Sequence, residues 1–102
     1  MPALKVWLDD VRKAPSGWVR CRWPDEVITL LKTGRVVEVS LDHDLGDDRR
    51  GTGYGVLLWI EQMVASDPRF PVPVIALHTQ NPVARERMVQ TLVAIERRRR
   101  AH

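Results

Sequence analysis

The chain has 102 residues, a formal net charge of +3, 44% hydrophobic and 28% charged residues. These values predict one globular domain over residues 1–102, and the length leaves no room for a second one. No apolar run could cross a bilayer and acidic residues follow too early for a secretory signal, so we expect a cytoplasmic protein without a membrane partner. A single cysteine, Cys21, cannot form an internal disulfide and agrees with a reducing compartment.

The positive charge is concentrated near the C-terminus. Four of the sixteen basic residues are Arg97 to Arg100, and the other twelve are outnumbered by thirteen acidic residues. A basic fold surface for nucleic acid is therefore not predicted. We interpret the arginine run as a solvated helix end whose cations suit the helix dipole, and non-specific contact with phosphate is the alternative.

Strand and helix patterns alternate along the first half of the chain. Alternating apolar side chains predict strands over residues 4–8 and 18–22. A proline and an acidic first turn open a predicted helix over residues 24–34, and Gly34 ends it. Residues 36–42 form the third predicted strand. The connection "DDVRKAPSG" is short for a parallel crossover, so the second strand pairs either in parallel or as a hairpin.

The second half repeats this alternation after a polar, glycine-rich loop. Residues 54–66 are almost wholly apolar and predict a deeply packed helix. Residues 72–78 form the fourth predicted strand, and Asn81 is the predicted cap of a last helix that begins at Pro82. Strands that alternate with helices predict an α/β fold with a mostly parallel sheet.

The unusual polar residues all fall where predicted strands end. In open α/β sheets, ligands bind outside the carboxyl ends of the strands. The residues at these ends are Asp9 and Asp10, then Asp42, His43 and Asp44, then His78, Thr79 and Asn81. Their convergence predicts a binding site at this edge of the sheet.

The carboxylates at this edge predict a divalent metal site. Asp9, Asp10 and Asp42 would repel one another without a cation, and oxygen-rich clusters suit Mg²⁺ or Mn²⁺, which we predict as the cofactor. Asp44 is either a fourth ligand or a turn residue, because the Leu-Gly pair after it indicates a turn. The alternative for the whole cluster is a hydrated acidic edge without a metal.

The motifs together resemble the receiver domain of response regulators. "LDD" is similar to the acidic pair after the first receiver strand, "TGYGVLLWI" to the third helix and "PVIALHT" to the fourth strand. The first receiver helix and the final strand with its lysine have no counterpart, and His78 stands where receivers carry threonine or serine. The pattern "LDD.R", "SLDHDLG", "TGY" and "H..NP" resembles a shortened branch, the cyclic-phosphate processing receiver domains of bacteria and phages.

The resemblance implies a truncated, flavodoxin-like receiver fold with a four-stranded, mostly parallel sheet and about three helices. It implies binding or hydrolysis of a cyclic phosphate from RNA repair or ADP-ribose metabolism, so the expected partner is a small phosphorylated nucleotide or an RNA end. Two alternatives stay open. One is a sensor of a phosphorylated ligand without turnover, and the other is a signalling or interaction module in which Asp42 accepts the phosphate.

The candidate catalytic residues are Asp42, His43 and His78. Opening a cyclic phosphodiester needs a base that activates water and an acid that protonates the departing oxygen, and histidine titrates close enough to neutrality for either role. Acid and base are not assigned by the sequence. In the alternative interpretation, both histidines only hold the local backbone.

Three further residues are predicted to contact the ligand. Arg12 matches the family pattern and could hold phosphate oxygens through two N–H groups. Asn81 is first a helix cap, but the helix end that it caps points free amides toward the same edge. Thr79 lies between this cap and the fourth strand.

Loss of two receiver helices would leave one sheet face thinly covered. Trp7 and Trp18 alternate with core residues and are predicted on this face. Either the last helix folds back over them, or a second copy or a partner covers them, and we expect a homodimer.

Overall fold

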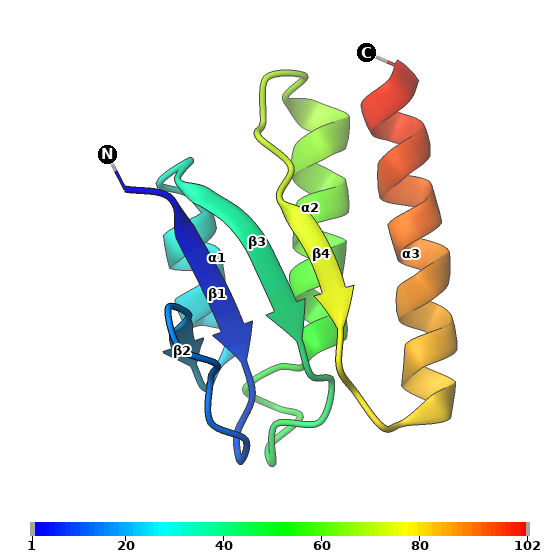
Figure 1. Ribbon diagram of the computed structural model, residues 1–102. Coiled ribbons are helices and arrows are strands. Elements are labelled where there is room, and N and C mark those ends of the chain that lie inside the picture. Colours follow the sequence, from blue (N-terminus) through cyan, green and yellow to red (C-terminus); the bar gives the residue numbers. More distant parts are fainter. Residues whose placement is uncertain (1, 102) are drawn as a thin grey trace.

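The computed structural model describes residues 2–101, which form a four-stranded parallel sheet with one layer of helices (Figure 1). In chain order the elements are β1 (Leu4–Leu8), β2 (Val19–Cys21), α1 (Pro24–Leu31), β3 (Val36–Leu41), α2 (Gly53–Ser66), β4 (Val74–Leu77) and α3 (Pro82–Ala101). The strand order is β2-β1-β3-β4, and every neighbouring pair is parallel. The predicted α/β fold is confirmed, and β2 is a parallel strand instead of a hairpin partner.

Element ends differ from the prediction by a few residues, for reasons of local backbone chemistry. The helix predicted to Gly34 ends at Leu31, because the chain tightens there and the N–H of Gly34 bonds to the carbonyl of Leu31. Gly34 has φ 76°, a conformation that glycine adopts without strain. β4 begins at Val74 instead of residue 72, since Pro73 has no N–H to donate to the sheet.

All three helices of the described chain lie on the same side of the sheet (Figure 1). The strands send alternate side chains toward them, as in Val6 and Leu8 of β1, which are fully buried. α2 contributes the centre of this core with Val56, Leu57 and Ile60. Because one helix layer covers one face, the hydrophobic core lies between the sheet and the helices.

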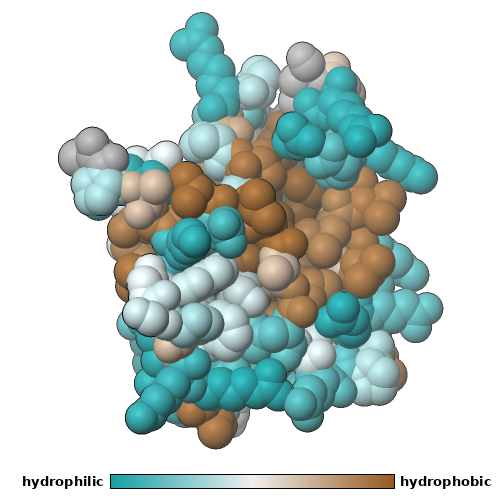
Figure 2. All heavy atoms as spheres, in the orientation of Figure 1, coloured by the Kyte–Doolittle hydropathy of each residue, from teal (hydrophilic) through white to brown (hydrophobic). Residues whose placement is uncertain are grey.

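Within residues 2–101, no helix covers the opposite face of the sheet. α3 packs along α2 and does not fold back over this face. The last helix therefore does not cover Trp7 and Trp18, and a second copy or a partner is the remaining possibility. Trp7 and Trp18 meet edge to face on the open side, with ring centroids 6.0 Å apart. Figure 2 shows hydrophobic residues gathered over this face and toward α3, whereas the end where the strands finish is mostly hydrophilic.

A helix that crosses a bilayer must be long and predominantly apolar. Within residues 2–101, none combines the length and the apolar character that a membrane crossing needs. This agrees with the prediction that no membrane-spanning segment is present in this part of the chain.

Candidate functional site

The carboxyl ends of β1, β3 and β4 surround a hollow of about 520 Å³, called here the acidic hollow. It is lined by Asp9, Asp10, Val11, Arg12, Asp42, Asp44, Gln80 and Asn81. Six of these eight were predicted from the sequence as ligand or metal residues. Val11 and Gln80 were not predicted, because a valine or a glutamine indicates a binding site only when its position in the fold is known.

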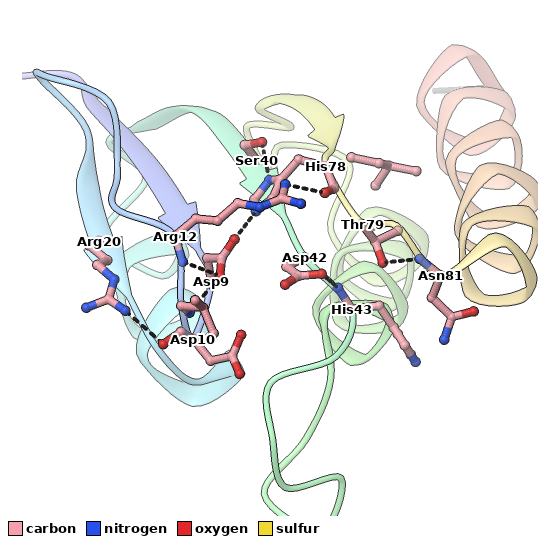
Figure 3. A network of polar contacts seen from close by, with 12 residues as sticks. Asp9, Asp10, Arg12, Arg20, Ser40, Asp42, His43, His78, Thr79 and Asn81 are labelled. Atoms are coloured by element: carbon pink, nitrogen blue, oxygen red, sulfur yellow. Dashed lines mark hydrogen bonds and ion pairs between the residues drawn. The ribbon is translucent and has the colours of Figure 1, made fainter.

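Asp9 is held by hydrogen bonds on both of its carboxylate oxygens (Figure 3). Oδ1 accepts the backbone N–H groups of Val11 at 2.8 Å and of Arg12 at 2.9 Å. Oδ2 lies 3.0 Å from Nε2 of His78. Burial alone would raise the pKa of Asp9, but these backbone bonds and His78 outweigh it and hold the pKa below its ordinary value. Asp9 is therefore an ionised anchor, and only 1% of it is exposed.

His78 is clamped between Asp9 and Ser40. Because a carboxylate only accepts hydrogen bonds, Nε2 of His78 carries the proton that faces Asp9. Nδ1 lies 2.7 Å from Oγ of Ser40, which donates to it when the ring is neutral. Burial lowers the pKa of His78, and the hydrogen bond with Asp9 opposes this effect. The ring therefore favours its neutral form more than an exposed histidine does.

Trp7 reaches across β3 and stacks on His78, with the ring centroids 4.0 Å apart and the planes 7° apart. Trp7 was predicted on this face, but neither Trp7 nor Ser40 was predicted as part of the site. Both were recognisable only through strand register, which pairs Trp7 with Ser40 and Ser40 with Ala76. The open face of the sheet thus fixes the ring plane of His78.

Asp42 is more open than Asp9. One of its oxygens accepts the backbone N–H of His43 at 2.8 Å, and the carboxylate lines the acidic hollow. Burial raises the pKa of Asp42, the neighbouring charges of Asp9 and Asp10 raise it further, and the bond from His43 opposes them. Asp42 therefore holds a proton more readily than an ordinary aspartate.

Gly53 sets the position of Asp42. The N–H of Gly53 donates to the carbonyl of His43 at 3.1 Å, so the first turn of α2 packs closely against the backbone that follows β3. A Cβ at this position would overlap the carbonyl oxygen of Asp42. The close approach is possible only with glycine, and the sequence signal was a glycine directly before the helix predicted over residues 54–66.

Arg12 and Asn81 link separate chain segments at the rim of the acidic hollow. A guanidinium N–H of Arg12 donates to the backbone carbonyl of His78 at 3.1 Å, which ties the ends of β1 and β4 together. Asn81 caps α3 as predicted, because its Oδ1 accepts the N–H of Ala84 at 3.0 Å. Its Nδ2 donates to a carboxylate oxygen of Asp44 at 3.2 Å, so Asp44 contacts the rim.

Three predicted residues do not line the acidic hollow. The side chain of His43 points away from Asp9 and His78, toward the side where Asn81 lies (Figure 3). Thr79 is 6% exposed, and its hydroxyl accepts the N–H of Asn81 at 3.2 Å. His78 lies behind Asp9. The two histidines therefore do not face each other as the predicted acid and base.

Comparison with known protein families agrees with this geometry. A family model described as the cyclic-phosphate processing receiver domain matches residues 4–94. The chain belongs to this family. No curated protein and no solved structure shows a significant match to this chain. The matched span includes all eight residues that line the acidic hollow of this receiver domain.

The donor set of the receiver domain fits a hard divalent cation. Asp9, Asp42 and His78 each offer one donor atom, and these atoms lie within 4.8 Å of one another. Among the described residues, the predicted ligands Asp10 and Asp44 line the hollow but fall outside this group. A cation would relieve the repulsion from Asp9 and Asp10, which adds to the effect of burial in raising the pKa of Asp42. Nε2 of His78 would have to lose its proton to bind the ion, so carboxylate ligation is the better fit.

Proposed function

We propose that this receiver domain binds a cyclic phosphate diester in the acidic hollow and opens the ring by hydrolysis. The observation that carries the proposal is Asp42, a partly buried carboxylate with a raised pKa that lines the hollow in a cyclic-phosphate processing family. A carboxyl group with such a pKa exchanges protons closer to neutrality than an ordinary one, which suits acid–base chemistry.

In the proposed reaction, Asp42 takes a proton from the attacking water, and the oxygen of this water bonds to phosphorus. One ester bond breaks, and Asp42 returns the proton to the oxygen that leaves. The product is a phosphate monoester, and atoms and charges balance without an oxidant or a further reactant. Asp42 is thus base and then acid in one turnover.

Arg12 and Asn81 bind and orient the phosphate in this account. Arg12 uses one N–H on the carbonyl of His78, and its other N–H groups can meet phosphate oxygens at the rim. Asn81 is fixed by its cap bond and its bond to Asp44. A rigid rim lowers the entropy that is lost when the ligand is positioned.

His78 is proposed as a positioning residue, since its Nε2–H is directed at Asp9 and not at the hollow. Bound between Ser40 and Asp9, it keeps the Asp9 carboxylate in one orientation. Asp9 in turn fixes the backbone at Val11 and Arg12, which brings Arg12 to the rim. Loss of His78 would therefore act on the ligand through Asp9 and Arg12.

We further propose that Mg²⁺ or Mn²⁺ is held by the carboxylates of Asp9 and Asp10, which line the acidic hollow beside Asp42 and leave Asp42 free to exchange its proton. The ion would supply positive charge for phosphate oxygens and for the charge that develops on them. The acidic lining by itself repels an anionic ligand, and Arg12 is the only cationic side chain among the eight lining residues. The excess of carboxylates thus supports a cation requirement for binding as well as for turnover.

A second candidate is a sensor that binds the same ligand without turnover. It is favoured by the positions of the two histidines, neither of which lines the acidic hollow among the described residues. In this case Asp9, Arg12 and Asn81 would still recognise a metal-bound phosphate. The two candidates differ only in whether the ring opens.

One experiment separates these functions. The protein is incubated with a panel of cyclic phosphates and Mg²⁺ or Mn²⁺, and product formation and melting temperature are measured together. Hydrolysis needs both a rise in melting temperature and a monoester product, whereas a sensor gives the rise alone. Neither product nor rise with any panel member would reject both, and phosphorylation of Asp42 by a small phosphodonor would favour a signalling receiver.

We also propose that a second copy of the chain covers the open sheet face. Trp7 and Trp18 lie there without a helix above them, and Lys5 and Glu38 are paired at 4.0 Å on the same face. A face with both charge signs around aromatic rings suits contact with itself in a symmetric dimer. Sedimentation of a monomer at high concentration would reject this assembly.

A further inference from the structure

A second hollow of about 200 Å³ adjoins the acidic hollow, and nothing in the proposed function uses it. It is lined by His43, Tyr54, Asn81, Val83, Ala84 and Arg87. Asn81 lines both hollows, so its side chain forms the boundary between them. Whereas the acidic hollow has four aspartates, this one has a guanidinium and no carboxylate in its lining.

Three polar groups around this second hollow have no protein partner within the described residues. Nδ1 of His43 is buried and has no hydrogen-bond partner among the described residues. Within the same residues, the structure gives no hydrogen bond or ion pair to the guanidinium of Arg87 or the hydroxyl of Tyr54. Most arginines near the strand ends are engaged, as Arg12 is with His78 and Arg20 with the carbonyl of Asp10. Free polar groups that surround one hollow are available to a ligand.

The side chain of His43 agrees with this assignment. It follows Asp42 directly, yet it points away from Asp9 and toward the side of Asn81 (Figure 3). Its backbone N–H orients Asp42 at 2.8 Å while its ring lines the second hollow. One residue therefore joins the two hollows, so a ligand whose reacting group lies at Asp42 would extend past His43.

We infer that the second hollow binds a second, separate phosphate group of the same ligand, with Arg87 as its main contact. This inference rests on the proposed function, and it narrows the substrate class to cyclic phosphates that carry another phosphodiester, phosphomonoester or pyrophosphate. Arg87 supplies charge and paired N–H donors, and it lies in the second turn of α3, whose N-terminal end adds positive potential. Cyclic phosphates without a second phosphate leave this hollow empty.

The test compares adenosine 2′,3′-cyclic phosphate with the same compound bearing a 5′-phosphate. Apparent affinities are measured for each from melting temperature against ligand concentration, with Mg²⁺ present. The 5′-phosphate should strengthen binding about tenfold, as one charge-assisted contact of this kind typically does. Arg87→Gln should remove this advantage and leave the affinity for the unphosphorylated compound unchanged.

Arg97→Gln is the matched control, because it removes the same charge from the exposed far end of the same helix. It should keep the advantage. Equal affinities for the two compounds in the unaltered protein, or equal loss in both variants, would overturn the inference while the proposed function stands. No binding of either compound, or of any other cyclic phosphate in the panel, would overturn both.

Two further ligands distinguish the sources of such a phosphate. A dinucleotide that ends in a 2′,3′-cyclic phosphate represents an RNA end, and a cyclic phosphate of ADP-ribose represents the pyrophosphate class. At least one should show the same dependence on Arg87, and the one that binds more tightly identifies the source. Independence from Arg87 for both would overturn the inference.

Discussion

The ends of β1 and β3 both carry an aspartate at the acidic hollow, but the pKa values of the two carboxylates are shifted in opposite directions. Asp9 is 1% exposed, has hydrogen bonds to both oxygens and has a lowered pKa. Asp42 is partly exposed, accepts one bond from the next residue and has a raised pKa. Two carboxylates whose environments shift their pKa values in opposite directions are suited to different chemical roles. Asp9 fixes the backbone at the site, and Asp42 is the carboxylate that we propose as the reactive group.

The largest effect that separates the two ends is expected from Asp42→Asn. Turnover of a cyclic phosphate should fall at least about 100-fold, because the amide cannot exchange the proton. The free energy of unfolding should not fall, since the raised pKa means that the ionised carboxylate is disfavoured in the folded state. Initial rates and urea unfolding measure the two quantities. A variant with retained turnover would show that Asp42 is not the reactive carboxylate.

At the other end, Asp9→Ala should lower the free energy of unfolding by about 2–4 kcal/mol. The backbone N–H groups of Val11 and Arg12 and the Nε2–H of His78 would all lose their acceptor. Asp10→Ala is the matched control, because among the described residues the side chain of Asp10 makes no comparable set of bonds, and it should change stability by about 0.5 kcal/mol or less. Equal losses in both variants would contradict the anchor role of Asp9.

The same pair has a pH signature. The folded-state pKa of Asp9 is below its ordinary value of 3.8, so its contribution is present above that pH and is lost as the pH falls through the folded-state pKa. The difference in stability between the unaltered protein and Asp9→Ala should therefore shrink below about pH 4. Urea unfolding across this range measures it, and a difference that grows in acid would contradict the lowered pKa.

Gly53→Ala should disturb the end of β3 from outside the hollow. The added methyl group would overlap the carbonyl of Asp42, so we expect a loss of roughly 1–3 kcal/mol and weaker ligand binding. Gly55→Ala lies in the same helix and meets nothing within 4 Å, so it should be neutral or slightly stabilising. Thermal unfolding of both variants gives the comparison. If the two variants melt alike, Gly53 is not what positions Asp42.

The smallest effect is expected from Ser40→Ala, which removes one buried hydrogen bond behind the anchor. Stability should fall by about 1 kcal/mol, because Nδ1 of His78 loses its partner at 2.7 Å. The histidine ring signals in NMR should also shift as the ring is freed to rotate against Trp7. Unchanged His78 signals would show that Ser40 does not hold the ring.

Much of this fold was predictable because its patterns are local. The strand at Leu4–Leu8 was predicted to the residue from the alternation of apolar side chains, and the last helix from Asn81 and Pro82. The acidic edge followed from one rule, that the ends of parallel strands meet. The direction of β2 could not be derived, because a short crossover is compatible with either pairing until the sheet is assembled.

The states of the site residues were less predictable, because they depend on contacts between distant segments. Asp9 and His78 are 69 positions apart, and their hydrogen bond decides which carboxylate is fixed. His43 points away from His78 because β3 ends at Leu41. The sequence pattern predicted that this strand ends one residue later. Types of residue at strand ends therefore predicted a site, but not the division of roles within it.

The measurement that tests the central claim most directly is a ³¹P NMR time course of a 2′,3′-cyclic nucleotide with the protein and Mg²⁺. The account predicts that the cyclic diester signal is replaced by a monoester signal, that Asp42→Asn stops the change, and that chelation of the ion stops it too. A cyclic signal that persists unchanged with the unaltered protein, for every ligand that raises its melting temperature, would contradict ring opening.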